Sequence, residues 1–483
     1  MAEFKEVLKH GRNYLVAIVA TRALGFISIP VYTRLLSPND FGVYSVFIGI
    51  IGILSSVMAL STDRSVSRYF FDQKNEEDFK EFVGTTIILA LVFFLLNSIL
   101  LIIFAEKFGN LVSLNKNVVY LIIPISFVNI VGLTFEQIYG PLKKSINIAI
   151  SSLSRVYIGF SFSILLILLF KSDKYYGQIL GQIFAGFIMI FYWVKKIKPY
   201  FKLSFDTAYI KYIFTYSVPL IPYALSGVII EQFGKVALGN SQDLSHAGYY
   251  SLALTVGSLV SIVIAVAHQA WNPYYMEYMN TKNYDQVDKD FVRIFKITLV
   301  VAIIVSSFGK EIGLLLAKKE FTASLYLIPI FTLGYVFYQF AYAYLRNFGY
   351  SKKTHFMTIT VFLSGFFNVL MNLILIKKYA ELGAAISFTL AYVLMTVIAW
   401  FFNKYYVKLH ETPMKHMIIP LLMIIPFYII LYLSLSINSL LLLIIFKIAL
   451  TFIFSAILFW KERLDITEYI KSILNKLKHA THK

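Results

Sequence analysis

Long apolar segments alternate with short polar segments along almost the whole chain. Windows of about 20 mostly apolar residues recur from Tyr14 to Trp460, and a helix of about that length crosses the hydrocarbon core of a bilayer. The pattern therefore predicts an all-α membrane protein with fourteen transmembrane helices. The predicted spans are residues 13–33, 41–62, 82–105, 118–138, 148–170, 175–194, 210–230, 247–268, 291–316, 324–345, 354–376, 380–402, 415–435 and 439–460.

The two halves of the chain resemble each other weakly but in order. Three features recur at a nearly constant offset of 206 to 209 residues: Phe41–Ser45 with Ala247–Ser251, Gly177 with Gly383, and Lys143–Lys144 with Lys352–Lys353. Because each repeat holds six spans, an even number, both repeats enter the membrane from the same side. This predicts two parallel, pseudo-symmetric six-helix lobes with a transport cavity between them.

The predicted domain organisation follows from the repeat. The first lobe covers residues 1–200, the second lobe 201–408, and two further helices 409–462. In the C-terminal tail, residues 463–483, apolar side chains fall on one helical face and lysines on the other. The tail is therefore predicted to lie flat on the anionic membrane surface, with a frayed cytoplasmic tail as the alternative.

Composition agrees with a membrane protein and excludes several functions. Apolar residues make up 58% of the 483 residues, against roughly 45–50% in soluble domains. The polar connections are too short for a soluble domain and no GxxxxGK[ST] loop is present, so ATP binding is not expected. The chain has no cysteine, which excludes disulfides and thiolate metal sites. The first span lacks a cleavage site and is interpreted as a retained helix.

The distribution of positive charge predicts the orientation. A net charge of +18 would indicate a nucleic-acid partner in a soluble protein, but in a membrane protein it indicates basic cytoplasmic loops. Of the 44 Lys and Arg residues, 29 fall in the segments on the N-terminal side of the membrane and 11 on the opposite side. Both termini are therefore predicted to be cytoplasmic, in the inner membrane, with membrane lipids and no nucleic acid as partners.

Charged residues inside the spans are the first candidates for function. Arg22, Arg155 and Lys447 lie within predicted helices, and Lys296 lies near an end from which it can snorkel. A charge at the bilayer centre costs about 2.5–3.5 kcal/mol on insertion scales. Arg22 and Arg155 are therefore expected to line a wet cavity; the alternative is a buried ion pair with an acidic residue that only holds helices together.

Charges at the ends of spans form a second group. Cations outnumber anions at or near membrane depth, which favours an anionic cargo such as a phosphate or pyrophosphate held by arginine. Ordinary interfacial charge is the alternative for these end residues. The predicted substrate-binding residues are Arg22, Arg155, Arg64, Lys235 and Arg34, and the predicted ion-coupling residues are Asp63, Glu136 and Glu231, at positions where Na+ or H+ coupling is expected.

Two prolines interrupt the seventh span. Pro219 and Pro222 free backbone carbonyls and bend a helix, so this span is predicted to be a hinge or a static kink. No catalytic residue, metal site or cofactor is predicted.

Several short motifs together resemble a known family. They are Gly25-Phe26, Ile29-Pro30, Thr33–Pro38 and Phe41–Ser45 in the first half, and Pro219–Pro222, Leu238-Gly239, Ala247–Ser251, Gln269–Pro273, Lys378-Tyr379 and Leu382–Ala385 in the second. In order and spacing they resemble the Wzx-type polysaccharide flippases, the lipid-linked oligosaccharide translocases of the MOP superfamily. The resemblance covers nearly the whole chain to about residue 460.

The resemblance implies a fold and a function. A two-lobed, fourteen-helix protein would move undecaprenyl-pyrophosphate-linked oligosaccharides between leaflets by alternating access, with glycan polymerase machinery as a candidate partner. The segment Thr21–Phe26 also resembles the first helix of lipid II flippases, in which the arginine that matches Arg22 faces the cavity. The basic residue that follows in those proteins is absent here, where Ser28 and Ile29 stand, which argues against lipid II as cargo.

Two other functions stay open. A MATE-like, cation-coupled drug antiporter would need a carboxylate in mid-helix, whereas Glu136 and Glu231 lie near span ends. Membrane glycan polymerases and ligases resemble one another in having a large external loop with catalytic residues. The longest external loop predicted here, residues 231–246, has about 16 residues. The protein is therefore predicted not to be an enzyme.

Overall fold

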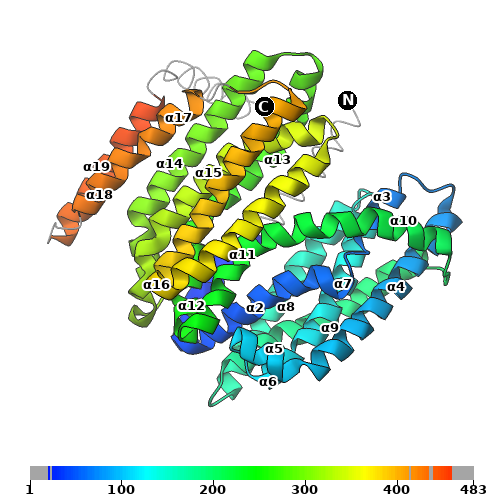
Figure 1. Cartoon of the computed structure of the whole chain (residues 1–483). Helices are drawn as coiled ribbons and strands as arrows, with labels where there is room; N and C mark the ends of the chain where they lie inside the picture. Colours follow the sequence, from blue (N-terminus) through cyan, green and yellow to red (C-terminus); the bar gives the residue numbers. More distant parts are fainter. Residues whose placement is uncertain (1–19, 22–23, 413–414, 435–438, 460–483) are drawn as a thin grey trace, which may run out of the picture.

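The computed structural model describes residues 20–21, 24–412, 415–434 and 439–459, and these residues are helical almost throughout (Figure 1). No strand occurs in this part of the chain. The predicted cavity residue Arg22 and the predicted membrane-surface tail both lie outside the described residues. The all-α class predicted from the apolar segments is confirmed.

The helix bounds follow the predicted spans closely. Residues 24–35 are helical ahead of the labelled elements. The labelled elements are α2 Pro38–Met58, α3 Arg64–Tyr69, α4 Glu76–Ile103, α5 Ala105–Val112, α6 Lys116–Tyr120, α7 Ile122–Tyr139, α8 Ser145–Leu169, α9 Tyr175–Ile197, η1 Lys198–Tyr200, α10 Thr207–Ser217, η2 Val218–Leu220, α11 Ile221–Ser241, α12 Leu244–Gly257, α13 Leu259–Asn280, α14 Tyr284–Leu316, η3 Lys319–Leu327, α15 Ile328–Tyr350, α16 Thr354–Phe402, η4 Asn403–Val407, α17 Lys415–Leu422, α18 Ile424–Ser434 and α19 Leu440–Phe459.

Twelve stretches of the described chain are long and apolar enough to cross a membrane. One of them, Thr354–Val407, has 54 residues, which as a single helix would be about 80 Å long at 1.5 Å per residue. Its backbone breaks at Ala380, where φ is 46° and ψ is −126°. This stretch therefore contains two of the predicted spans. The first predicted span, 13–33, is only partly described, so the count of fourteen stays a prediction.

The helices form two groups that meet at one end and diverge toward the other (Figure 1). We call α2–α9 the first lobe and α11–α16 the second lobe. Within the first lobe α9 packs against α7 and α8, and within the second α16 packs against α11 and α15. The lobes join where α2 contacts α11 and α12. We call the end of the molecule around the first residues of α2 and α12 the closed end, and the opposite end the open end.

Two glycines of the internal repeat bring the lobes together at the closed end. A Cβ on Gly42 would overlap the carbonyl oxygen of Leu244, and a Cβ on Gly248 would lie 2.5 Å from the carbonyl oxygen of Pro38. Beside them, the Asn39 amide donates a hydrogen bond to the Asp243 carboxylate at 3.3 Å. The repeated FGVYS and AGYYS motifs are therefore where the two lobes pack backbone to backbone.

The seventh predicted span is divided between the lobes. α10 packs on α3 and α4, where the Tyr209 hydroxyl donates to Asp78 at 2.7 Å and the Tyr212 hydroxyl donates to Asp72 at 2.6 Å. α11 packs on α2 and α16 instead. Between them, η2 contains Pro219, and Pro222 lies in the first turn of α11. The interruption predicted from these prolines is present.

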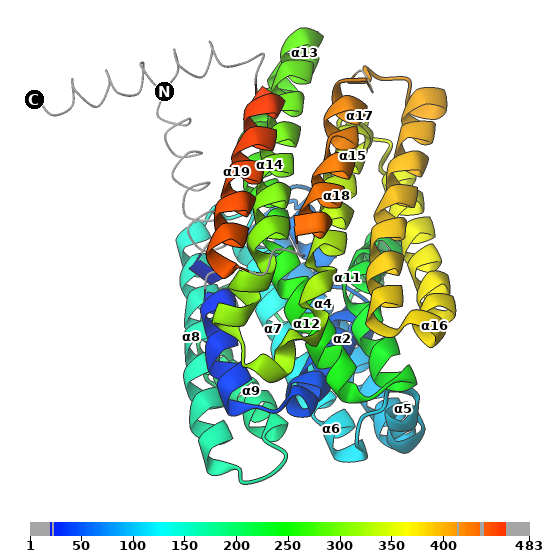
Figure 2. The same cartoon turned by 90° about the vertical axis from the view of Figure 1, so that its left-hand side faces the viewer.

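The last helices are attached to the second lobe by polar contacts. Figure 2 shows α18 and α19 lying alongside α14 and α15. The ammonium of Lys447, on α19, forms an ion pair with Glu311 on α14, and the Tyr428 hydroxyl on α18 lies 3.0 Å from the Ser306 hydroxyl. A lysine buried at this depth needs such a partner. The ion pair of Lys447 therefore holds α19 against α14. Lys447 lines no cavity that we find among the described residues.

Candidate functional site

Two polar cavities lie among the described helices. The larger has a volume of about 820 Å³ and lies between α11, α13, α15 and α16 of the second lobe, with Arg64 of α3 reaching it from the first lobe. The smaller has a volume of about 450 Å³ and lies between α2, α7, α8 and α9, within the first lobe. Arg64 makes the larger cavity a site that both lobes build.

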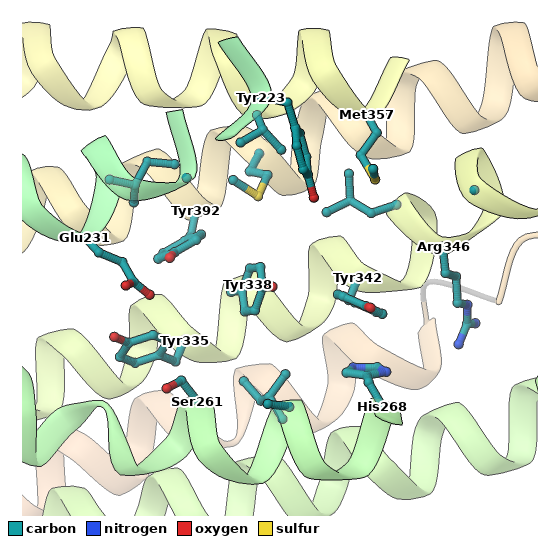
Figure 3. A pocket seen from close by; sticks show the side chains of 18 of the residues that line it. Tyr223, Glu231, Ser261, His268, Tyr335, Tyr338, Tyr342, Arg346, Met357 and Tyr392 are labelled. Carbon is teal, nitrogen blue, oxygen red and sulfur yellow. The ribbon is translucent and has the colours of Figure 1, made fainter. Parts of the chain in front are cut away.

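Tyrosine rings form much of the wall of the larger cavity (Figure 3). Tyr335, Tyr338 and Tyr342 are spaced i, i+3 and i+7 on α15, so they share one helical face. Tyr392 of α16 lies beside them, with ring centroids 5.2 Å from Tyr338 and 6.2 Å from Tyr335. Tyr223 of α11 faces them from the opposite wall. The cavity is thus flat-walled and aromatic, with hydroxyl groups at the ring edges.

Charged and polar groups mark the two ends of this cavity. Glu231 lies at one end, beside Tyr335 and Tyr392, whereas Arg346 and His268 lie toward the other (Figure 3). The His268 ring stacks on Tyr342 at a centroid distance of 3.9 Å, and its Nε2 lies 2.6 Å from Gln339 Oε1. The wall is therefore anionic at one end and basic at the other.

Arg346 packs among three aromatic rings and also interacts electrostatically with Asp288. Its guanidinium carbon lies 4.3 Å from the Phe291 ring centroid, 4.4 Å from Trp271 and 4.8 Å from Tyr275. One terminal nitrogen donates to the Thr412 hydroxyl at 3.3 Å. Cation–π contacts of this kind stabilise a desolvated guanidinium. They fix the basic end of the cavity in place.

The smaller cavity pairs a guanidinium with a carboxylate. Arg155 donates to the Asn129 side chain, stacks 5.8 Å from the Trp193 ring, and interacts electrostatically with Glu136. Trp193 in turn donates to Ser151 at 2.6 Å. Arg155 therefore fits both interpretations drawn from the sequence, because it lines a polar cavity and also has an acidic partner.

The predicted site residues do not lie together, because the structure divides them between two cavities and other positions. Arg155 and Glu136 line the smaller cavity, and Arg64 and Glu231 line the larger one. Asp63 directly precedes Arg64 at the N-cap position of α3, where its side chain makes no capping hydrogen bond. Burial raises the pKa of the Asp63 carboxyl above its ordinary value, and the Arg64 guanidinium opposes that rise. Asp63 and Arg64 therefore interact electrostatically where the first lobe reaches the larger cavity.

Two predicted substrate-binding residues line neither cavity. Arg34 is exposed and donates to the carbonyl of Pro30 at 3.0 Å. Lys235 lies one helical turn after Glu231, where its ammonium donates to Gln232 at 2.9 Å. For Arg22, which lies outside the described residues, a cavity role stays a prediction.

Sequence reasoning missed the aromatic wall. The stripe at positions 335, 338 and 342 was visible in the sequence, but tyrosine is also common at membrane interfaces. Arg346 was missed because it directly follows the predicted span 324–345, where a charged residue is expected at the membrane interface. Only the packing of α13 and α14 around it shows its place.

Comparison with known sequences places the chain among proteins of glycan assembly. The family model described as polysaccharide biosynthesis protein matches residues 7–279. The chain is 20% identical over 392 residues to the "probable low-salt glycan biosynthesis flippase Agl15" of Haloferax volcanii, covering 79% of this chain and 80% of that protein. It is 24% identical over 270 residues to an uncharacterized membrane protein, MJ1068, of Methanocaldococcus jannaschii, and that match spans about half (52%) of each chain.

Solved structures with the same fold are membrane transporters. A lipid II flippase, MurJ, in an inward closed conformation is similar with a TM-score of 0.71 and 16% identity, covering 93% of this chain and 99% of that one. An inward-facing multidrug resistance MATE family transporter of the MOP superfamily is similar with a TM-score of 0.59 and 12% identity, covering 82% and 98%. At 16% and 12% identity, these similarities show the fold and nothing about the substrate.

Proposed function

Because this chain belongs to the polysaccharide biosynthesis protein family, we propose that it is a flippase that carries undecaprenyl-pyrophosphate-linked oligosaccharides from the inner to the outer leaflet of the cytoplasmic membrane. The observation that carries the proposal is the larger cavity, which the second lobe and Arg64 of the first lobe build together. A site shared by two lobes changes its access when the lobes move, as alternating access requires. The family and the flippase relative are of transport type, and no catalytic role is proposed.

The charge distribution supports loading from the cytoplasm. The basic loops, including Lys143–Lys144, Lys195–Lys202 and Lys352–Lys353, lie at the open end, whereas the segments at the closed end carry fewer basic residues. By the positive-inside rule, the open end faces the cytoplasm, as do both termini. A lipid with its pyrophosphate in the inner leaflet would then reach the cavity from the side where the lobes diverge.

The arginines supply the chemistry that a pyrophosphate needs. A guanidinium can donate two parallel hydrogen bonds to phosphate oxygens. Arg64 is in place to do this at the larger cavity, and we assign Arg22 and Arg155 supporting roles along the path. Asp63, Glu136 and Glu231 are the carboxylates through which a Na+ or H+ gradient would act, and glycan polymerase machinery would receive the product.

One observation favours a second function. A carboxylate, Glu231, faces an aromatic wall in the larger cavity, and aromatic rings with a carboxylate suit an organic cation. A cation-coupled drug antiporter is therefore the second candidate. Export of organic cations such as ethidium from cells, lost in Glu231→Gln, would support it, whereas a flippase leaves that export unchanged.

Reconstitution tests the proposal. Purified protein is placed in vesicles with lipid-linked oligosaccharide extracted from the producing cells, and outward exposure of the glycan is followed with an impermeant glycosidase. We expect transfer that depends on the protein and that Arg64→Ala slows at least tenfold, because a hydrogen bond to a charged group contributes about 1.5–3 kcal/mol. The control is Arg68→Ala, on the same helix but exposed and paired with Asp72. Equal rates in both variants would contradict the role of Arg64; no transfer by the wild type would contradict the function.

A further inference from the structure

The larger cavity carries more information than the binding of a phosphate requires. A pyrophosphate needs cationic donors, and among the described residues that line this cavity only Arg64 and Arg346 supply a guanidinium, while five tyrosines form the walls. Tyrosines with a polar edge and a flat apolar face match a pyranose ring, which has apolar C–H faces and a rim of hydroxyls. The chemistry of the wall is therefore that of a carbohydrate site.

We propose that the aromatic cavity of the second lobe is the glycan subsite, in which the saccharide stacks on Tyr338 and Tyr392 while the pyrophosphate stays at Arg64. This inference rests on the proposed function and assigns the two parts of the cargo to different lobes. It places the sugars away from the smaller cavity of the first lobe, where the guanidinium of Arg155 and the carboxylate of Glu136 already interact.

The arrangement of charges favours one orientation of the bound lipid-linked saccharide in the cavity. Arg64 approaches the cavity beside Tyr223, close enough for the two groups to interact electrostatically. Glu231 stands beside Tyr335 and Tyr392 at the end opposite Arg346 (Figure 3). A carboxylate repels a pyrophosphate but accepts hydrogen bonds from two neighbouring sugar hydroxyls. The pyrophosphate is therefore kept at Arg64 and away from Glu231, and the sugars extend toward Glu231.

The size of the cavity agrees with a short saccharide. A hexose residue fills roughly 200 Å³ at the packing density of protein interiors, so a cavity of about 820 Å³ holds about three sugars and some water. Polar side chains available along the path include Gln269 and Asn272 of α13. Together with the tyrosine hydroxyls they can hydrogen-bond sugars without demanding one stereochemistry, as stacking recognition also does.

Photo-crosslinking in the producing cells tests this assignment on the native glycan. The photoreactive residue p-benzoylphenylalanine replaces Tyr338 in one variant and Met357, on the opposite wall of the same cavity, in a second. Val156 of the smaller cavity and the exposed Leu96 of α4 are the comparison positions. Mass spectrometry of the irradiated protein then identifies what each position touches. We expect sugar-bearing adducts at Tyr338 or Met357 and in clear excess over Val156, with none at Leu96.

The outcomes separate the subsite from the function. Sugar-bearing adducts at Val156 in equal or greater yield would overturn the subsite and leave the flippase standing. Sugar-bearing adducts at none of the three cavity positions would overturn both.

Replacement of single rings gives a second readout. In the vesicle assay, Tyr338→Leu removes the flat ring and should weaken the apparent affinity for the glycan-bearing lipid about two- to twelvefold, as expected for the loss of an aromatic stacking contact of about 0.5–1.5 kcal/mol. Tyr338→Phe keeps the ring and should lie closer to the wild type. Tyr432→Leu, an exposed tyrosine on α18, is the control. Equal affinity in Tyr338→Leu and the control would overturn the stacking role.

Discussion

At the scale of single residues, the contact between Asp63 and Arg64 is the part of the site most open to regulation. The two residues are neighbours in sequence, and Arg64 reaches the larger cavity while Asp63 interacts with it electrostatically. An ionised Asp63 competes with an anionic ligand for the guanidinium. Protonation of Asp63 therefore leaves Arg64 more available to a phosphate.

This coupling predicts that anion binding strengthens as the pH falls. Because burial raises the pKa of Asp63, its carboxyl takes up a proton at a higher pH than a free aspartate does. Below that pKa the neutral carboxyl no longer competes, and above it the anion does. We expect the affinity for inorganic pyrophosphate to rise as the pH falls through this raised pKa, measured by calorimetry on protein in nanodiscs.

Substitution of the carboxyl isolates its contribution. Asp63→Asn resembles the protonated form at every pH, so its affinity should be high throughout and follow only the titration of pyrophosphate itself. Asp72→Asn, which changes an exposed carboxylate near Arg68, should keep the wild-type profile. Parallel pH profiles for the wild type and Asp63→Asn would show that Asp63 does not gate Arg64.

At the scale of elements, the seventh span connects the two lobes through η2, which interrupts the helix between α10 and α11. α10 is hydrogen-bonded to the first lobe through Tyr209 and Tyr212, and α11 packs on α16 of the second lobe. Proline has no backbone N–H to donate and its ring clashes with the preceding turn, so no regular α-helix runs through η2. Movement of one lobe against the other must bend the chain at this joint or break the contacts beside it.

Straightening the joint should slow transfer without unfolding the protein. In Pro219→Ala/Pro222→Ala the restored N–H groups favour a continuous helix, and we expect glycan transfer in vesicles to fall about tenfold while the melting temperature in detergent stays the same or rises. Pro420→Ala, inside α17 and outside both lobes, is the control. Normal transfer in the double variant would identify the interruption as a static kink.

At the scale of the whole molecule, much of the fold could be predicted because the bilayer imposes a length and a polarity on each segment. The apolar segments located the helices, and the break at Ala380 falls on the first residue of the predicted span 380–402, which three residues separate from the predicted span 354–376. The recurring FGVYS and AGYYS motifs indicated two lobes, and Gly42 and Gly248 proved to be where those lobes pack.

The site could be predicted only in part, because its residues meet through packing between lobes. Arg64 and Glu231 line one cavity although 167 positions separate them, and no periodicity in either segment encodes that approach. Arg34 has the same charge as Arg64 but is exposed, and its guanidinium donates a hydrogen bond to the carbonyl of Pro30. Tyr338 shares a helical face with Tyr335 and Tyr342, but this spacing alone does not show that the face borders a cavity.

The closed end offers a direct test because the chain contains no cysteine, so introduced thiols report alone. Asn39 and Asp243 touch across the two lobes, and Asn39→Cys/Asp243→Cys can be bridged by a short, reversible bis-methanethiosulfonate reagent. Lys144→Cys/Tyr200→Cys, whose native side chains touch within the first lobe, gives a bridge that leaves the lobes free to move.

The decisive measurement is transfer of the lipid-linked oligosaccharide in vesicles by the Asn39→Cys/Asp243→Cys protein before bridging, after bridging and after reduction. If the closed end must open to release the glycan, transfer stops on bridging and returns on reduction, while the Lys144→Cys/Tyr200→Cys protein transfers throughout. Undiminished transfer across a fully bridged closed end would contradict alternating access between the two lobes.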